Sequence, residues 1–595
     1  MRTSAILAPE ATDKNPSPVD NLANLRVKLS EIESDFILLS MQNAFGNFID
    51  GPSDIEFISG FSGSNGKAVI SKEKAVLLVD GRYVKQAKEQ TDNSIWEIKQ
   101  FPDFDANTII SEFSSSGKSL AVIAQSISYG SYVSILELIR RLGLSIKLIE
   151  PDFLRTRQNS RTTIFLHDSE QIGESQSERI CKIQAELDSD ERLLLADQSM
   201  IGWLFGVRLS SATESKSVLP CCVALISKSG KPVLFCDLDV ANMLPDFDIK
   251  KLDEFEDAMA SLSCKDVVIC DYSTIPAYFV LYLHTRDFNT RDSRNKYREF
   301  FCIKNDTEIR NQRIAAESTS LAFIKTLAFT ENESGLTEID ICNFFESTAK
   351  KLPGFVDLSF NAISAFGKNT SIVHYNPKNC GNSEIRGRGL FLFDAGIHFN
   401  NSTTDMTRTV FIGEIGESDE FDQRLKGIYT VILKSVIMFS VAKFPKKVKA
   451  CIIDSIARYE IWKSGNDYQF GTGHGVGSYG NVHEPPRISQ TSTSVMKSGI
   501  VVTVEPGIYE QDFGIRLENM LLTKCSESDQ FLEFETLNYI PFCWKLIDHS
   551  MLSEFEKIWL ASYHKAIFDK FSSQFEDDAV TLKWLEINTV DRDSV

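Results

Sequence analysis

Five side chains in the C-terminal half of this 595-residue chain have the chemistry of metal ligands, four of them carboxylates and one an imidazole. They are Asp394, Asp405, His474, Glu505 and Glu518. Oxygen donors with a single nitrogen favour Mn²⁺, leave Zn²⁺, Co²⁺ or Fe²⁺ open, and disfavour a soft metal that needs thiolates. This donor set predicts a site for one or two divalent cations.

The two aspartates lie where a β-hairpin would fold them together. The apolar segment 390–393 ends at Asp394, and the turn-forming residues 400–402 lead to Asp405 at the start of a second strand-like segment. Asn and Ser are typical of such turns, and apolar or β-branched residues on both sides are typical of strands. We therefore expect the two carboxylates to lie close together.

The two glutamates repeat this arrangement. The apolar segment 500–504 ends at Glu505, and the segment 514–519, which contains Glu518, would return on the other side of Asp512. All four carboxylates are then expected to converge on one buried core.

Carboxylates in a buried core are costly unless positive charge neutralises them. Arg408 and Arg516 could each pair with one acid, but four acids and one imidazole suit divalent cations better. The imidazole belongs to the segment 471–477, in which four glycines allow the backbone to come close to a metal. Because this segment lacks the Lys-Ser/Thr ending of a P-loop, its glycines do not indicate phosphate binding.

Taken together, these motifs resemble those of the pita-bread metallopeptidases of family M24, specifically the long, three-domain Xaa-Pro aminopeptidases (aminopeptidase P). The resemblance covers nearly the whole chain. In the C-terminal half it rests on Asp394-Ala-Gly, Thr404-Asp405-Met-Thr-Arg408-Thr, Gly471-Thr-Gly-His474-Gly-Val-Gly, Asn481-Val-His483-Glu484, Val504-Glu505-Pro-Gly and Gly514-Ile-Arg516-Leu-Glu518-Asn519. In the N-terminal half it rests on Phe57-Ile-Ser-Gly60, Leu77-Leu-Val-Asp80-Gly81-Arg82-Tyr83 and Ala196-Asp197 with Ile201-Gly-Trp203. One departure is Pro485-Pro486, which stiffens a segment where the family usually has a glycine.

The resemblance implies an α/β and α+β fold, with two creatinase-type α/β domains followed by a pita-bread catalytic domain. The alternation of helix-like and strand-like segments supports the α/β assignment, and the first two domains could share a fold. A helix with acidic residues in its first turn is expected to open the catalytic domain after Lys304. The expected divisions are a polar tail at 1–20, domain I at 21–158, domain II at 159–302 and the catalytic domain with a C-terminal tail at 303–595.

The same resemblance implies how the ligands are shared. One cation would be held by Asp394, and the other by His474 and Glu505. Asp405 and Glu518 would bridge the two ions, which are expected to be Mn²⁺, with Zn²⁺ or Co²⁺ as the alternatives.

The resemblance also implies which residues take part in catalysis. Glu505 would act as general base, while His374 and His483 would contact the substrate, stabilise the oxyanion and pass a proton toward the leaving nitrogen. Arg516 would orient a ligand carboxylate by contacting it directly, without touching the substrate. The other histidines are expected to be structural, namely His167, His284, His398, His549 and His564.

The implied activity is hydrolysis of the bond between an N-terminal residue and a following proline. Two cations bridged by carboxylates lower the pKa of a shared water, so that hydroxide exists near neutral pH, and they polarise a carbonyl. A dedicated site is needed because proline has a tertiary amide and a fixed φ. A prolidase that cleaves Xaa-Pro dipeptides stays open, although its chains are shorter, and methionine aminopeptidase and metal-free creatinase-like enzymes fit poorly. A catalytically silent peptide-binding protein is also open, but retention of all five ligands favours the enzyme.

Composition limits the partners and the compartment. A net charge of −19 with dispersed Lys and Arg disfavours nucleic acid and anionic membranes. No apolar run of about eighteen residues predicts a membrane span, and the N-terminus fits neither a secretory signal nor a transit peptide. Twelve cysteines scattered through the chain, several within apolar runs, indicate a reduced, cytoplasmic protein. The resemblance adds a homodimer that pairs through the catalytic domain.

Overall fold

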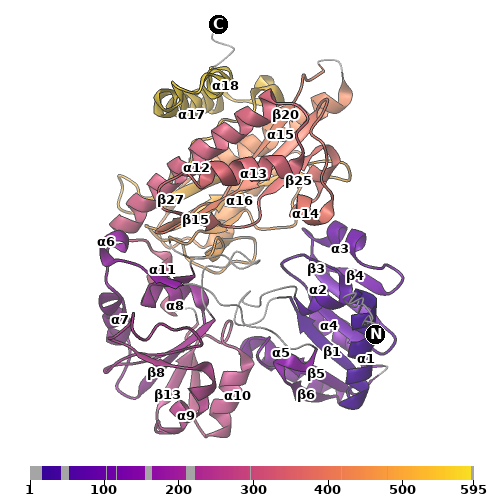
Figure 1. The fold of residues 1–595 in the computed structure, drawn as a ribbon, viewed down its shortest axis with the longest axis vertical. Helices are drawn as coiled ribbons and strands as arrows, with labels where there is room; N and C mark the ends of the chain where they lie inside the picture. The colour runs from indigo at the N-terminus through magenta and orange to yellow at the C-terminus, as the bar shows by residue number, and fades with distance from the viewer. Residues whose placement is uncertain are drawn as a thin grey trace, which may run out of the picture.

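Three bodies follow one another along the chain (Figure 1). The computed structural model describes residues 17–41, 53–101, 103–115, 117–154, 164–209, 221–294, 296–416, 419–478 and 480–590. The predicted polar tail at 1–20 lies almost wholly outside these residues, and the predicted boundary at 158–159 lies outside them entirely.

Domain I is a six-stranded sheet with helices on both faces. Along β1 (Phe36–Ser40), Ile37 and Leu39 belong to the core under α1 (Pro18–Glu31), whereas Phe36 and Leu38 belong to the core under α4 (Ala106–Phe113). This alternation is the period of two that a strand buried on both faces requires. The strand order is β4 (Trp96–Phe101), β3 (Ala75–Asp80), β2 (Lys67–Ser71), β1, β5 (Ser119–Ile123) and β6 (Ser145–Ile149).

Domain II repeats the topology of domain I. Its strand order is β12 (Asp248–Lys250), β11 (Val233–Cys236), β10 (Cys222–Ser227), β8 (Glu191–Leu195), β13 (Val267–Cys270) and β14 (Asn289–Asp292). In both sheets the second and third strand pairs in this order are antiparallel and the other three are parallel, and the strands follow the same sequence order. The expectation that the first two domains share a fold is confirmed, although no repeat is visible in the sequence itself.

The C-terminal domain contains small, mostly antiparallel sheets that share one hydrophobic core. One sheet has the order β16 (Ile363–Phe366), β17 (Gly389–Ala395), β20 (Met406–Ile412), and another has the order β21 (Lys443–Pro445), β28 (Phe531–Thr536), β27 (Asn519–Cys525), β24 (Val501–Val504), β22 (Gly473–Gly475), β23 (Glu484–Ile488). Helices α12 (Asp306–Asn332), α13 (Glu338–Ala349), α15 (Glu420–Ser440) and α16 (Ala450–Trp462) pack around them, and α17 (Glu554–Phe571) and α18 (Ala579–Thr589) close the C-terminal end (Figure 1).

The helix that opens this domain, α12 (Asp306–Asn332), begins where the sequence predicts. The Asn305 side chain accepts from the backbone N–H of Glu308, and the Glu308 carboxylate accepts from that of Asn305. This capping box satisfies two of the N–H groups that a helix start leaves free.

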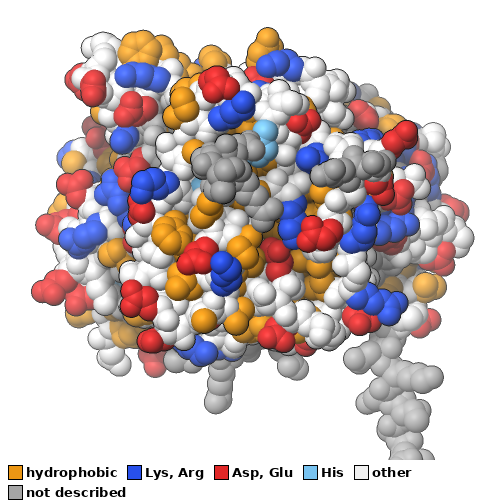
Figure 2. Space-filling model, turned by 90° about the horizontal axis from the view of Figure 1, so that it is seen from above, with side chains coloured by type: hydrophobic (Ala, Val, Ile, Leu, Met, Phe, Trp, Pro, Cys, Tyr) orange, Lys and Arg blue, Asp and Glu red, His pale blue; other side chains and the backbone are white. Residues whose placement is uncertain are grey.

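The face drawn in Figure 2 does not show the charge pattern of a polyanion-binding surface. On the face in Figure 2, Lys and Arg side chains are interspersed with Asp and Glu, and no extended basic area is visible. Within the described ranges, no helix is both long enough and apolar enough to cross a membrane.

Close packing at Gly396 gives the first prediction. A Cβ there would lie 2.8 Å from the carbonyl carbon of Thr404 and would also meet the Ser359 hydroxyl, so Gly396→Ala has no room. We expect this variant to lose about 1–3 kcal/mol of stability, measured as a lower thermal and denaturant midpoint. The matched control is Gly427→Ala in α15, where nothing lies within 4 Å and a modest gain is expected. Equal midpoints for both variants would contradict the packing argument.

Candidate metal centre

The aspartate pair is held as the hairpin prediction requires. Asp394 lies near the end of β17, which pairs with β20 so that Asp394 is opposite Thr407, and Asp405 immediately precedes β20. Asp405 is two residues before Thr407 and is therefore the diagonal neighbour of Asp394 on the same face, at a separation of about 7–8 Å that two side chains can bridge.

The glutamate pair comes from the neighbouring sheet. Glu505 follows β24 and Glu518 precedes β27, and these strands pair through Val504 and Asn519. Between them, β25 (Gly507–Tyr509) and β26 (Gly514–Arg516) form the predicted hairpin around Asp512.

The donors of these residues form three overlapping groups, in each of which the ligand atoms lie within 4.8 Å of one another. The groups are Asp394, Asp405 and Glu518; His474, Glu505 and Glu518; and Asp405, His474 and His483. Because Asp405, His474 and Glu518 each belong to two groups, the three groups form one connected cluster. The structure therefore brings together all five residues that the sequence singled out as ligands.

The imidazole of His474 offers one nitrogen to this cluster. Its Nδ1 lies 3.0 Å from the carbonyl oxygen of Gly475, which can only accept, so the proton is on Nδ1. Its Nε2 lies 3.3 Å from Asp405 Oδ2 and 3.6 Å from Glu505 Oε1. A backbone hydrogen bond that fixes the tautomer in this way is typical of metal-binding histidines.

Burial raises the pKa of all four carboxyl groups. The rise is large for Asp405 and Glu518, because the negative charge of the neighbouring acids adds to burial. It is smaller for Asp394 and Glu505, where the positive charge of Arg516 opposes burial. Cations among these groups would counter the shifts.

Two carboxylate oxygens supply a test of whether the residues fit metal ions. Asp394 Oδ1 and Glu518 Oε1 are buried and have no hydrogen-bond partner. An unsatisfied buried oxygen is costly, and both atoms belong to the donor groups. Carboxylate oxygens with one imidazole nitrogen are the ligands of a hard or borderline divalent cation. The donor set fits.

The two arginines considered from the sequence behave differently. Arg516 contacts Asp394 Oδ2 directly, and its Nε donates to the Thr407 hydroxyl at 3.2 Å. Arg408, which could have paired with one of the acids, pairs with no acid among the described residues. It donates instead to the carbonyl oxygens of Glu518 and Ile540. Successive residues of a strand point to opposite faces, so Arg408 lies away from the acids that Thr407 faces.

Domain I reaches the cluster through two residues after β3 that sequence reasoning gave no role. The Tyr83 hydroxyl is hydrogen-bonded to Nδ1 of His374, and the two rings lie 4.9 Å apart, edge to face. Arg82 pairs with Asp80 (Nη2 to Oδ2, 2.8 Å) and, with Arg516, adds to burial in lowering the pKa of His374 well below its ordinary value. His374 is therefore a neutral imidazole. The sequence feature that could have indicated a role for Arg82 and Tyr83 is their position directly after an apolar strand.

His483 lies beside the ligand cluster. Its ring centroid is 4.3 Å from that of His474, and its side chain is exposed. The next residue, Glu484, forms a buried ion pair with Lys304, whose side chain is 1% exposed. Lys304 Nζ also donates to the Phe301 carbonyl oxygen at 3.0 Å. The His483 segment is thus anchored to the start of α12.

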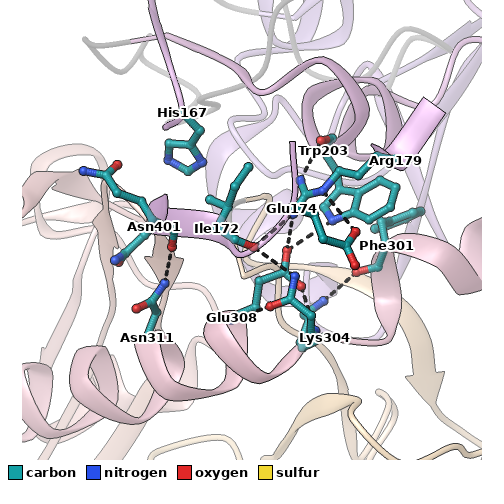
Figure 3. Close-up of polar contacts among 12 residues, drawn as sticks. His167, Ile172, Glu174, Arg179, Trp203, Phe301, Lys304, Glu308, Asn311 and Asn401 are labelled. Atoms are coloured by element: carbon teal, nitrogen blue, oxygen red, sulfur yellow. Dashed lines mark hydrogen bonds and ion pairs between the residues drawn. The ribbon is translucent and has the colours of Figure 1, made fainter. Parts of the chain in front are cut away.

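Domain II also contacts the start of α12, through Glu308 (Figure 3). Arg179 of α7 (Gln176–Ala185) is fully buried and donates to Glu308 Oε1 at 2.9 Å, and Trp203 Nε1 donates to the same oxygen at 3.2 Å. Glu308 is the capping residue of α12, so domain II and the His483 segment are fixed to one helix terminus.

Three family models match the chain. The model for metallopeptidase family M24 matches residues 310–524, that for the C-terminal region of this peptidase matches 530–591, and the creatinase/prolidase N-terminal domain matches 22–155. A probable Xaa-Pro aminopeptidase P of Blastomyces gilchristii is 31% identical over 96% of this chain and 99% of its own length. Its counterpart in Paracoccidioides lutzii is 32% identical over 96% and 98%. The chain belongs to the aminopeptidase P family of M24 metallopeptidases.

Solved structures agree with this placement. The crystal structure of an X-prolyl aminopeptidase from Caenorhabditis elegans, described as a cytosolic enzyme with a di-nuclear active site, superposes with a TM-score of 0.88 at 25% identity, covering 97% of this chain and 100% of that one. A prolidase from Thermococcus sibiricus, at 23% identity and a TM-score of 0.50, shares the fold over only 62% of this chain. The aminopeptidase P architecture therefore extends through all three bodies, and the predicted fold of two creatinase-type domains and a pita-bread domain is confirmed.

The Lys304–Glu484 pair yields a stability prediction. Lys304→Met leaves the Glu484 carboxylate buried without a partner and should cost about 3–5 kcal/mol, whereas adding Glu484→Met should recover much of the loss. Denaturant and thermal unfolding would measure both. As control, Lys565→Met breaks a pair whose side chains are 74% and 57% exposed and should cost less than about 1 kcal/mol. A Lys304→Met variant as stable as the control would refute the anchoring role.

Proposed function

We propose that this aminopeptidase P family member removes the N-terminal residue from peptides whose second residue is proline. One observation carries the proposal: five metal-ligand side chains converge in a three-domain chain that matches Xaa-Pro aminopeptidases along nearly its full length. A peptide-binding protein without catalysis would have no need of the buried, mutually repelling carboxylates.

The proposed cofactors are two divalent cations. Asp394 would hold one, His474 and Glu505 the other, and Asp405 and Glu518 would serve both, in keeping with the overlap of the donor groups. The oxygen-rich set favours Mn²⁺, with Zn²⁺ or Co²⁺ as alternatives. When bound, such cations polarise a carbonyl and lower the pKa of a water molecule.

The remaining steps are assigned to residues around the ligands. Glu505, a ligand with a partly exposed side chain, would accept the proton of the attacking water. His374 is neutral, and its Nδ1 is occupied by Tyr83, so its Nε2 is available to stabilise the oxyanion. His483 would pass a proton to the proline nitrogen, and Arg516 would hold Asp394 in place.

A prolidase-like dipeptidase is the second candidate. Its fold accounts for only 62% of this chain, and here the Tyr83–His374 contact makes domain I part of the site. A site assembled from an accessory domain and the C-terminal domain is better suited to peptides that continue beyond proline.

Assembly and compartment complete the proposal. Exposed apolar side chains on α16 and at the start of α17 support a homodimer that pairs through the catalytic domain, namely Ile452, Tyr459, Trp462, Phe555 and Ile558. All twelve cysteines lie in the described part of the chain and are free thiols, which supports a reducing compartment, the cytoplasm.

Release of the N-terminal residue from Arg-Pro-Pro, Arg-Pro and Arg-Ala-Ala, with and without Mn²⁺, tests the proposal. We expect Mn²⁺-dependent cleavage of Arg-Pro-Pro and at least about a hundredfold lower kcat/KM for the other two. Cleavage of Arg-Pro alone would favour the prolidase reading, and no cleavage of any peptide, with no metal retained, would overturn both.

The amount of bound metal should distinguish a variant of His474, a proposed ligand, from a variant of His483, which lies beside the cluster. His474→Ala removes a ligand nitrogen and should abolish both bound metal and turnover. His483→Ala should lower kcat by about 10²–10⁴-fold, the scale of one proton-transfer group, while bound metal, measured by elemental analysis, is retained. Loss of metal in His483→Ala would show instead that this residue is a ligand.

A further inference from the structure

We propose that Arg487 is a specificity-determining residue, which pairs with a carboxylate on the part of the peptide that follows the scissile bond. The inference rests on the proposed function and narrows its substrate class. Substrates would be Xaa-Pro peptides with a negative charge directly after proline.

The placement follows from strand register. Strands β22 and β23 are antiparallel, and His474 lies opposite Arg487. Side chains of such partners stand on the same face of a sheet. Because His474 turns its Nε2 toward Asp405 and Glu505 on that face, Arg487 stands beside the metal-ligand cluster. His483 lies just before the same strand on the side assigned to the leaving nitrogen, so Arg487 borders the residues after proline.

Arg487 differs from the other arginines of the site because its positive charge is not paired with an acidic side chain. Arg516 holds Asp394, and Arg82 holds Asp80. Arg487 is exposed and has neither a hydrogen bond nor an ion pair with any described residue. Its guanidinium presents five donors in a fork that matches a carboxylate.

The surroundings favour an anion at this position. Partial enclosure and the nearby positive charge of Arg82 lower the pKa of Arg487, with Asp80 opposing them. A substrate carboxylate would relieve this repulsion. The local charge matters because the whole chain, at −19, repels acidic peptides at long range.

The segment that carries Arg487 is stiff. Pro485 and Pro486 fix φ on the approach to this residue. Pairing of β23 with β22 fixes the next residues. A preorganised guanidinium loses less freedom on binding, which favours selection at this position.

Two sources could supply the carboxylate, and matched peptides distinguish them. Arg-Pro-Glu-amide against Arg-Pro-Gln-amide isolates an acidic side chain, and Arg-Pro-Gly against Arg-Pro-Gly-amide isolates a terminal carboxylate. With Mn²⁺-loaded full-length enzyme, kcat/KM should be about tenfold higher for the charged member of at least one pair, the scale of a charge-assisted hydrogen bond.

Arg487→Gln should bring that ratio close to one by raising KM for the charged peptide, with its kcat and the kinetics of the neutral peptides unchanged. Arg487→Lys should keep part of the preference. The control is Arg141→Gln on the outer end of α5 (Tyr129–Leu142), an exposed arginine with the same change of charge, which should behave as wild type.

The outcomes are distinct. If Arg487→Gln abolishes the preference for Arg-Pro-Glu-amide over Arg-Pro-Gln-amide, the partner is a side-chain carboxylate. If it abolishes the preference for Arg-Pro-Gly over Arg-Pro-Gly-amide, the partner is the terminal carboxylate. Either result supports the proposal. A wild-type enzyme without preference, or one whose preference survives Arg487→Gln, would overturn it. If wild type cleaved none of these peptides, the proposed function itself would fail and this inference with it.

Discussion

Mutual repulsion among four clustered carboxylates, three of them buried and one partly exposed, is the constraint on which this architecture depends. Asp394, Asp405, Glu505 and Glu518 share one region with a single imidazole, and only Arg516 among the described cations contacts one of them. Each acid is delivered by the end of a strand in one of two sheets, so the strands cannot shift without separating the donors. Burial raises the pKa of every one of these groups, and divalent cations are the natural partners that make such a core stable.

The accessory domains belong to the site as well as to the fold. Tyr83 of domain I orients His374 from across the domain boundary, and Arg179 of domain II meets the helix start that also anchors the His483 segment through Lys304. The two histidines expected to act on substrate are therefore each supported by a different domain. A shorter chain with only the pita-bread domain would keep the ligands and lose these supports, which gives a physical reason for the three-domain layout.

Local patterns predicted the parts of the site that are local. Hairpins place Asp394 near Asp405 and Glu505 near Glu518 because only short segments separate the members of each pair, and the capping residues of α12 are visible in the sequence. Contacts between distant segments were missed: Tyr83 and His374 are 291 positions apart, and no periodicity connects them. Arg408, a possible partner of one acid from its place in the sequence, points away from the acids because neighbouring strand residues face opposite ways.

Charge gives the proposed site a direction. The acidic ligands and the unpaired Arg487 carry opposite charges at neighbouring positions, so a peptide with a free amino terminus and a carboxylate after proline complements both. Cations bound by the acids would offset much of the negative charge of the carboxylates and leave little of it for the substrate amine, whereas Arg487 keeps its full positive charge because no described residue pairs with it. Selection by charge should therefore act more strongly after proline than at the N-terminal residue, which leaves the identity of that first residue free to vary.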